Sequence, residues 1–301
     1  MQKTLISIIG STGIGKTKLA IEMAKHIGTE IISCDSRQFF KEMKIGTATP
    51  TDEELAQAKH HFIGHLSVQD YYSIGQYEED ALEKIEEIFE KNDFAVLVGG
   101  SMMYEKAVVE GLNDLPEANA ENQEKLQKIL DEEGLEKLQE ILKNLDEEYY
   151  NVVHKENPRR LLRAIDVIWQ TGRKYSEIIA EPKHKRDFKV IRIGITAPRE
   201  IMYERINLRV DKMLEKGLID EVKSLTKYQK LVPLQTVGYT EIFKYLEGTW
   251  DLDFAIEEIK KNSRRYAKRQ ETWNRKVENV TWLPYDYSEE QLHEILSKIE
   301  K

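Results

Sequence analysis

The sequence predicts an α/β protein with a parallel-sheet core and an all-helical insertion domain. Two continuous apolar runs, TLISIIG from Thr4 and FAVLVGG from Phe94, each end in glycine. Such runs are typical of strands that are covered on both faces, as in parallel sheets. Helical patterns alternate with these runs, which indicates βαβ units. Between Pro116 and Pro182 the pattern is helical with charged flanks and contains no strand candidate.

The elements of the first part follow from periodicity and from the residues that interrupt it. Residues 73–91 have an apolar stripe at helical spacing, made by Ile74, Tyr77, Ala81, Ile85 and Ile88. Gly28 ends the helix that we expect from residue 18. We expect strands at 4–10, 30–35 and 94–100, and helices at 18–28, 51–60 and 73–91. The pair His60–His61 would then lie on a helix, where neighbouring residues point apart, so joint metal binding is disfavoured.

After the insertion the strand pattern returns. We expect strands at 190–198 and 280–284, helices at 199–216, 217–227 and 253–276, and a last helix from Ser288. The core would be built from residues 1–115 and 188–301 and would carry the basic C-terminal helix. Residues 116–187 would form the helical insertion domain.

The segment Gly10-Ser11-Thr12-Gly13-Ile14-Gly15-Lys16-Thr17 matches the phosphate-loop pattern G-x-x-x-x-G-K-[ST]. It lies between a predicted strand and a predicted helix, so the core is P-loop NTPase-like. Its glycines let successive backbone N–H groups point at one anion, and the helix N-terminus adds partial positive charge. Lys16 can reach terminal phosphate oxygens, and the Thr17 hydroxyl can ligate Mg²⁺. The motif does not tell which phosphate compound binds.

A carboxylate is expected beside this loop. The run FAVLVGG ends in two glycines, whereas a common P-loop ATPase has an acid there. Asp35 follows the second predicted strand, and carboxyl ends of neighbouring strands in a doubly wound sheet face one crevice. Asp35 can therefore accept a proton from a nucleophile or hold a metal-bound water. An aspartate after a strand is also common as a turn former, and that alternative stays open.

Charge is unevenly distributed along the chain. The net charge of −9 argues mildly against a nucleic-acid partner. However, residues 155–186 contain nine Lys/Arg and four acids, and residues 260–276 contain eight Lys/Arg and one acid. A basic face on an acidic protein is therefore possible, although solvated helix faces would give the same pattern.

Cysteine content and hydropathy suggest a compartment. Cys34 is the one cysteine, which excludes an internal disulfide framework and fits a reducing cytosol. No segment has the roughly 18 apolar residues of a membrane helix, and the N-terminal run leads directly into the glycine loop instead of a cleavage site. We expect a cytoplasmic protein, a monomer, with no membrane partner.

Several motifs occur in the order seen in tRNA dimethylallyltransferases of the short bacterial type, which the chain resembles over nearly its whole length. They are the phosphate loop, SCDSRQFFKEMKIGTATPT, His60–His61, VGGSMMY, NPRRLLRAIDVIWQTGRKYS, TVGYTEIFKYLEG and IKKNSRRYAKRQETWNRK. The resemblance implies transfer of dimethylallyl from dimethylallyl diphosphate to N6 of tRNA adenine 37, with Mg²⁺, in tRNAs that read codons beginning with U. The partner would be the tRNA anticodon stem-loop.

The resemblance also implies roles for residues at the matching positions. Asp35 would be the general base, and Thr12 and Arg209 would act near the diphosphate, with Arg205 as a further clamp. The diphosphate would lie in the loop from Gly10 to Thr17. The tRNA would contact Asp35, Ser36, Arg37, Gln38, Ser101, Arg159, Arg160, Leu161, Leu162, Arg163, Arg264, Arg265, Lys268, Arg269, Trp273 and Arg275. This chain has Ser11, Arg37, Thr49 and Met102–Met103 where the family usually has other residues.

Three other functions remain open from the residues alone. A small-molecule P-loop kinase would use Asp35 as base for a phosphoryl acceptor, and an adenylate prenyltransferase would use a free nucleotide. A non-catalytic RNA-binding NTPase would use Asp35 only to position Mg²⁺. A kinase would consume ATP and would give the basic C-terminal helix no purpose.

Overall fold

The computed structural model describes residues 2–299 and divides the chain into two compact units. The first unit consists of Met1–Val109 and Arg186–Lys301, and the second is Glu110–Lys185. The sequence-based division at residues 116 and 187 lies near these bounds. Among residues 2–299, none of the helices is both long and apolar enough to cross a membrane.

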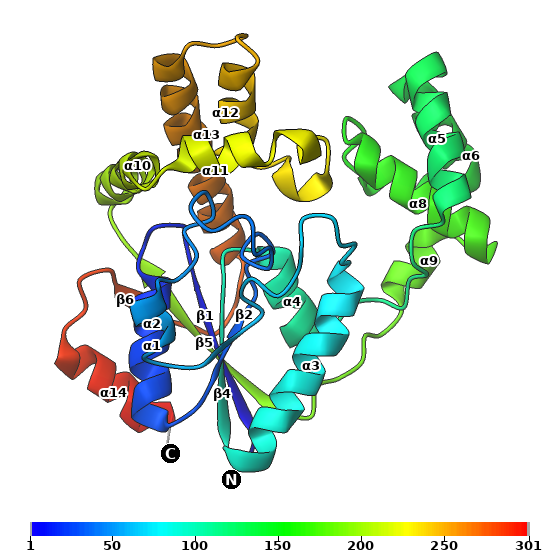
Figure 1. The fold of residues 1–301 in the computed structure, drawn as a ribbon. Coiled ribbons are helices and arrows are strands. Elements are labelled where there is room, and N and C mark those ends of the chain that lie inside the picture. Colours follow the sequence, from blue (N-terminus) through cyan, green and yellow to red (C-terminus); the bar gives the residue numbers. More distant parts are fainter. Residues whose placement is uncertain (1, 300–301) are drawn as a thin grey trace. The chain divides into compact units, whose positions relative to one another are not determined.

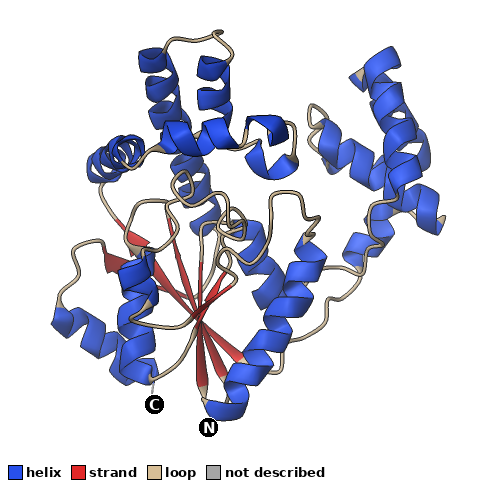
Figure 2. Cartoon of the chain, in the orientation of Figure 1, coloured by secondary structure: helices blue, strands red, loops and turns tan. Residues whose placement is uncertain are grey.

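The first unit is built on one six-stranded sheet with strand order β3-β2-β4-β1-β5-β6, and every pairing is parallel. The strands are β1 (Thr4–Gly10), β2 (Ile31–Ser33), β3 (His60–His61), β4 (Phe94–Val98), β5 (Lys189–Thr196) and β6 (Val280–Pro284). β1 and β4 are buried along their whole length, as their continuous apolar sequences predicted. Figure 2 shows these strands as a central layer with helices on both sides.

Helices cover both faces of the sheet. α1 (Lys16–Ile27) and α14 (Glu289–Ile299) pack on one face, and α3 (Ile74–Lys91) and α4 (Met102–Glu110) pack on the other (Figure 1). α3 begins with a capping box between Ser73 and Gln76. Its residues Tyr77, Ala81 and Ile85 are fully buried, which confirms the predicted apolar stripe.

A layer of helices lies over the carboxyl edge of the sheet. It contains α10 (Arg199–Glu215), α11 (Leu218–Ser224), α12 (Tyr239–Leu246) and α13 (Leu252–Asn274), with short 3₁₀ turns at Thr226–Tyr228 and Val232–Leu234. Figure 1 shows this layer above the ends of β1, β2 and β4. Its apolar residues join the core of α3 and the sheet, so the layer is fixed to the strands.

The second unit is all-helical and has a core of its own. It contains α5 (Ala120–Glu133), α6 (Leu135–Leu145), α7 (Glu147–Val152), α8 (Pro158–Thr171) and α9 (Tyr175–Ala180). Leucines at helical spacing on α6, Leu138 and Leu142, pack against Leu161 and Ile165 of α8. The fully buried Asp166 accepts hydrogen bonds from Asn122 and Gln170, each of 3.0 Å, and pairs with Arg163.

Three parts of the first unit differ from the sequence-based expectation. The helix expected at 51–60 is wrong beyond its first turn: α2 covers only Asp52–Leu55, although its capping box is present. His60 and His61 form strand β3 instead, because they pair with Ile31 and Ile32 at the sheet edge. Two short helices were not predicted from the sequence: α4, of nine residues, and α12, of eight.

Candidate active site at the carboxyl edge of the sheet

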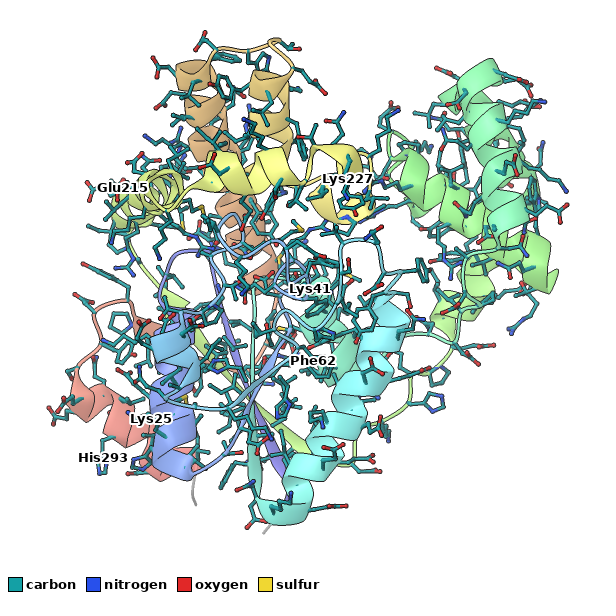
Figure 3. All side chains as sticks on the ribbon, viewed as in Figure 1. Lys25, Lys41, Phe62, Glu215, Lys227 and His293 are labelled. Atoms are coloured by element: carbon teal, nitrogen blue, oxygen red, sulfur yellow. The ribbon has the colours of Figure 1, made fainter. Side chains whose placement is uncertain are left out.

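One large cavity of about 990 Å³ lies within the first unit, between the carboxyl ends of the strands and the overlying helices. The β1–α1 loop, the segment after β2, the glycines after β4, and helices α10 and α13 all contribute to its wall. Lys41, which is labelled in Figure 3, also lines it. Its lining residues include Thr12, Gly13, Gly15, Lys16, Thr17, Asp35, Gln38, Gly100, Arg205, Arg209 and Tyr266.

The phosphate loop has the geometry that its sequence predicts. It follows β1 directly and ends at α1, and Gly13 and Gly15 have φ of 75° and 115°. These left-handed conformations favour glycine because a side chain would be strained there. Among the described residues, no side chain caps α1. Its first N–H groups can therefore bind an anion in the cavity.

Lys16 brings a cation into the cavity. Its Nζ donates to the Ser11 carbonyl at 2.9 Å. Burial lowers the pKa of Lys16 to about 8, against the opposing effect of the Asp35 carboxylate, and the Arg209 guanidinium lowers it further. The three charged groups therefore influence each other within one site, as the sequence analysis expected for Lys16 and Asp35.

Asp35 lies just beyond the end of β2. Its Oδ1 accepts a hydrogen bond from the Arg37 backbone N–H at 3.1 Å. A Cβ built on Gly100 would lie 2.8 Å from the Asp35 Oδ2, and one on Gly99 would lie 2.5 Å from the Cys34 carbonyl carbon. The double glycine after β4 therefore lets the Asp35 segment pack directly against it. This close approach explains why glycines, and no acid, end that strand.

Two arginines of α10 face the same cavity. Arg205 Nε donates to the Gly13 carbonyl at 2.9 Å, and Arg209 Nη2 donates to the Thr47 carbonyl at 3.0 Å. Burial lowers the pKa of Arg209, while the Asp35 carboxylate raises it. Lys16, Arg205 and Arg209 thus bring positive charge to the phosphate loop, and the Asp35 carboxylate lines the same cavity. Such a site can bind a polyphosphate and accept a proton close to it.

The segment after Asp35 is fixed by side chains from other loops. Ser36 N–H donates to Ser101 Oγ at 3.0 Å, and the two hydroxyl oxygens lie 2.8 Å apart. Gln38 Nε2 donates to the carbonyls of Thr47 and Ala48, at 3.3 and 3.2 Å. Arg37 Nη1 reaches the Val232 carbonyl at 3.4 Å. Of these residues, Gln38 lines the cavity together with Asp35, and the other contacts hold the segment on either side of them.

Sequence reasoning missed the anchor of the loop at residues 44–49. Glu221 of α11 accepts hydrogen bonds from the N–H groups of Lys44, Ile45 and Gly46, at 2.9, 2.7 and 2.9 Å. The hydroxyl of Tyr239 donates to the same carboxylate at 2.7 Å. Glu221 is one acid among many, so no sequence signal marks it.

Two further site residues, Gln270 and Tyr266 on α13, were not predicted from the sequence. The side chain of Gln270 bonds to Thr12 of the phosphate loop and to the Gly100 carbonyl, and the Tyr266 hydroxyl bonds to that same carbonyl. Both residues occur in a basic stretch that reads as a solvated surface. Their spacing of four residues, on the buried side of α13, is the only signal that could have indicated an inward role.

The outer face of α13 is basic. Arg265, Lys268, Arg269 and Arg275 are exposed. Arg264 is partly buried and donates to Asn207 Oδ1 at 2.7 Å. Trp273 is half-buried, with Lys106 Nζ 5.7 Å from its ring centroid. The predicted RNA-contacting residues of this helix thus divide into an exposed set and a packed set.

In the helical unit, part of the predicted tRNA-binding segment is wrong as a contact surface. Leu161 and Leu162 are 0% and 8% exposed and belong to the unit's own core, because they lie on the apolar face of α8. Arg163 pairs with Asp166 and also donates to the Pro116 carbonyl. Arg159 and Arg160 are exposed at the start of α8.

The hydroxyl of Thr17 is the metal ligand that the sequence predicts. Within residues 2–299, no cluster of three or more His, Cys, Asp or Glu side chains is placed to hold a metal. Thr17 lines the cavity at the start of α1, and His60 and His61 are partly buried on β3. His61 Nε2 lies 2.6 Å from a carboxylate oxygen of Glu30, so a hydrogen bond holds this histidine at the sheet edge.

Known proteins are similar to this chain in sequence and in fold. The model of the IPP transferase family matches residues 38–277. A tRNA dimethylallyltransferase of Christiangramia forsetii is 49% identical over 300 residues, with 99% of each chain covered. A tRNA isopentenylpyrophosphate transferase from Bacillus halodurans, solved by crystallography, is 36% identical with a TM-score of 0.73, covering 99% of this chain and 96% of that one.

A eukaryotic dimethylallyltransferase, crystallised acting on tRNA, has a TM-score of 0.83 at 26% identity, covering 99% of this chain and 77% of that one. These matches confirm the predicted P-loop NTPase-like α/β fold class and the resemblance stated from the motifs. The chain belongs to the IPP transferase family.

Proposed function

We propose that this protein transfers the dimethylallyl group of dimethylallyl diphosphate to N6 of adenine 37 in tRNAs that read codons beginning with U. The observation that carries the proposal is the position of Asp35, which lines the same cavity as the phosphate loop. The relatives named tRNA dimethylallyltransferase support it. A kinase would need no basic outer face on α13, so that alternative is not favoured.

The reaction requires a proton acceptor and an anion site at a short separation. The exocyclic N6 forms a bond to C1 of the prenyl group while the C1–O bond breaks, and diphosphate leaves with the electron pair. N6 loses one proton, which Asp35 accepts. A positioned carboxylate contributes roughly 10²–10⁴-fold to such a step. The adenine must leave its stack, which costs less from a loop than from a duplex.

The leaving diphosphate would be held by groups of the phosphate loop and α10. Lys16, Arg205 and Arg209 line the cavity around the loop, and the N-terminus of α1 points at it. Thr12 would contact the diphosphate from within the loop. Cations and N–H groups that are already in place stabilise charge that develops on the leaving group.

Mg²⁺ fits this site because its preferred ligands are oxygen atoms of hydroxyls, phosphates and water. The Thr17 hydroxyl and the diphosphate oxygens would hold it, and Asp35 could hold one of its waters. When bound, Mg²⁺ would neutralise part of the charge on the leaving group.

The tRNA would contact the basic outer face of α13 and the exposed arginines of the helical unit. Arg265, Lys268, Arg269 and Arg275 are exposed on α13, as are Arg159 and Arg160 on α8. Gln38 lines the cavity with Asp35, and the flipped base would enter there and contact Ser36, Arg37 and Ser101. We propose that residues 110–185 act as a separate RNA-contacting domain of a cytoplasmic monomer.

Product analysis tests this function directly. The purified protein is incubated with labelled dimethylallyl diphosphate, Mg²⁺ and unmodified tRNA whose residues 36–38 are AAA. We expect label on one adenine, identified by nucleoside mass spectrometry as the N6-dimethylallyl derivative. A tRNA with adenine 37 replaced by guanine is the matched control. The proposal would be contradicted if the tRNA acquired no label while the protein consumed ATP with free nucleosides as acceptors.

A further inference from the structure

We infer that Gln270 is a positioning residue. It fixes the phosphate loop relative to the double glycine Gly99–Gly100, which packs against Asp35. The inference rests on the proposed prenyl transfer. Gln270 lies in α13 and is 1% exposed. It touches none of the groups that would react, so its effect would act through the two segments that it joins.

The amide of Gln270 makes one hydrogen bond to each segment. Its Oε1 accepts from the Thr12 backbone N–H at 2.7 Å, and its Nε2 donates to the Gly100 carbonyl at 2.8 Å. A backbone N–H can only donate and a carbonyl can only accept, so one orientation of the amide satisfies both. Buried groups of this kind are costly to leave without partners.

Each bonded segment carries one half of the proposed chemistry. Thr12 precedes Gly13 in the loop that would hold the diphosphate. Gly100 lies against Asp35, since a Cβ on Gly100 would be 2.8 Å from Asp35 Oδ2 and 3.4 Å from Gln270 Nε2. The Tyr266 hydroxyl donates to the Gly100 carbonyl at 2.8 Å and supports the same segment. A single side chain therefore joins the leaving-group site to the base site.

The rate of prenyl transfer is sensitive to the distance between the phosphate loop and Asp35. N6, C1 and the leaving oxygen must align while the proton reaches Asp35, and a displacement of about 1 Å can lower the rate roughly 10²-fold. The same helix carries the exposed Arg269 directly before Gln270 and the exposed Arg265 five positions before it. The helix proposed to contact tRNA is thus the helix that holds the two halves of the site together.

Two substitutions separate this role from general packing. Gln270→Met keeps the length of the side chain and removes both bonds. Gln270→Glu keeps an acceptor for Thr12 but removes the donor to Gly100. Asn274→Leu is the matched control, because Asn274 is also buried and lies one turn further along the same helix.

The test measures kcat and KM for both substrates, the single-turnover rate at saturating donor and tRNA, and the melting temperature of each variant. Gln270→Met should lower kcat about 10- to 100-fold, with both KM values within about threefold of the parent. Gln270→Glu should lower kcat at least as much. Asn274→Leu should keep kcat within about threefold, whatever its melting temperature.

Parent-like kcat in both Gln270 variants would overturn the inference, as would an equal fall of kcat in Asn274→Leu. If Gln270→Met does not fold, Gln270→Glu decides alone, and a parent-like kcat in that variant would overturn the inference. A parent that transfers no prenyl group contradicts the proposed function instead, so the two failures are distinguishable.

Discussion

At the residue scale, the charge state of Lys16 decides how well the phosphate loop holds an anion. Burial lowers the Lys16 pKa to about 8, so the side chain loses its charge as the pH rises through that value. The donor's terminal phosphate stays ionised there. Binding the anion requires protonated Lys16, and above pH 8 the dissociation constant should rise by up to about tenfold per pH unit.

Calorimetric titration of the parent with dimethylallyl diphosphate between pH 7 and 10, without tRNA, checks this prediction. Lys16→Arg is the control: arginine keeps its charge over this range, so its dissociation constant should change little. A parent dissociation constant that is flat from pH 7 to 10 would show that Lys16 is charged throughout.

Gly99 tests whether close packing behind Asp35 matters. A Cβ at this position would lie 2.5 Å from the Cys34 carbonyl carbon and 2.6 Å from the Asp35 backbone nitrogen, and backbone atoms cannot move aside easily. Gly99→Ala should lower the free energy of unfolding by about 1–3 kcal/mol and the transfer rate at least tenfold.

Urea denaturation and single-turnover assays measure the two effects. Gly75→Ala in α3 is the control, because the nearest atom to its Cβ would be Ser73 Oγ at 3.7 Å. It should leave both quantities unchanged or raise stability slightly. Parent-like behaviour of Gly99→Ala would mean that β2 and β4 can separate without cost.

The site residues that the sequence revealed are those within local motifs. The phosphate loop and Asp35 follow from a short pattern and from the topology of parallel sheets. Gln270 and Glu221 do not, because each binds backbone groups far away in the chain: Gln270 and Thr12 are 258 positions apart. Polar side chains that satisfy remote backbone atoms leave no periodic or compositional signal.

At the element scale, α13 has an inner face that holds the site and an outer basic face. If the outer face binds tRNA, Arg265→Ala combined with Arg269→Ala should weaken tRNA binding and reduce its dependence on salt. Each lost phosphate contact lowers the slope of log K against log salt by about 0.7–0.9. Filter binding at several salt concentrations measures both effects.

Lys25→Ala with Lys298→Ala is the charge-matched control. Both lysines are exposed, on α1 and α14, where Figure 3 shows Lys25. This pair should leave affinity and slope unchanged. Equal losses in both double variants would indicate a general charge effect, with no binding face on α13.

Long periodic elements were predictable and short ones were not. α3, α10 and α13 have 18, 17 and 23 residues, which gives the apolar pattern room to repeat. α2 was overextended because its acidic first turn and capping box indicate a helix start, while strand pairing at Ile31 decides where it stops. Tertiary contacts therefore override local propensity at residues 56–61.

At the scale of the whole molecule, the chain has separate apolar cores for its two units. Asp166 is fully buried in the helical unit and bonds Asn122, Gln170 and Arg163. Asp166→Ala removes the buried acceptor that these three donors share and should destabilise that unit by about 3 kcal/mol. Hydrogen exchange should show lost protection confined to residues 110–185, with tRNA affinity reduced.

Donor binding should be unaffected by this change, because all residues that line the large cavity belong to the other unit. Asp131→Ala, at the exposed Asp131 of α5, should alter neither exchange nor affinity. Loss of protection across both units in Asp166→Ala would mean that the chain unfolds as one cooperative body.

The central claim is that Asp35 accepts the adenine's proton within the cavity that holds the diphosphate. The most direct measurement is the single-turnover transfer rate of Asp35→Asn at saturating donor and tRNA, with the dissociation constants of both substrates. We predict a fall in rate of about 10² or more, with both constants within about threefold of the parent. A parent-like rate in Asp35→Asn would contradict the claim.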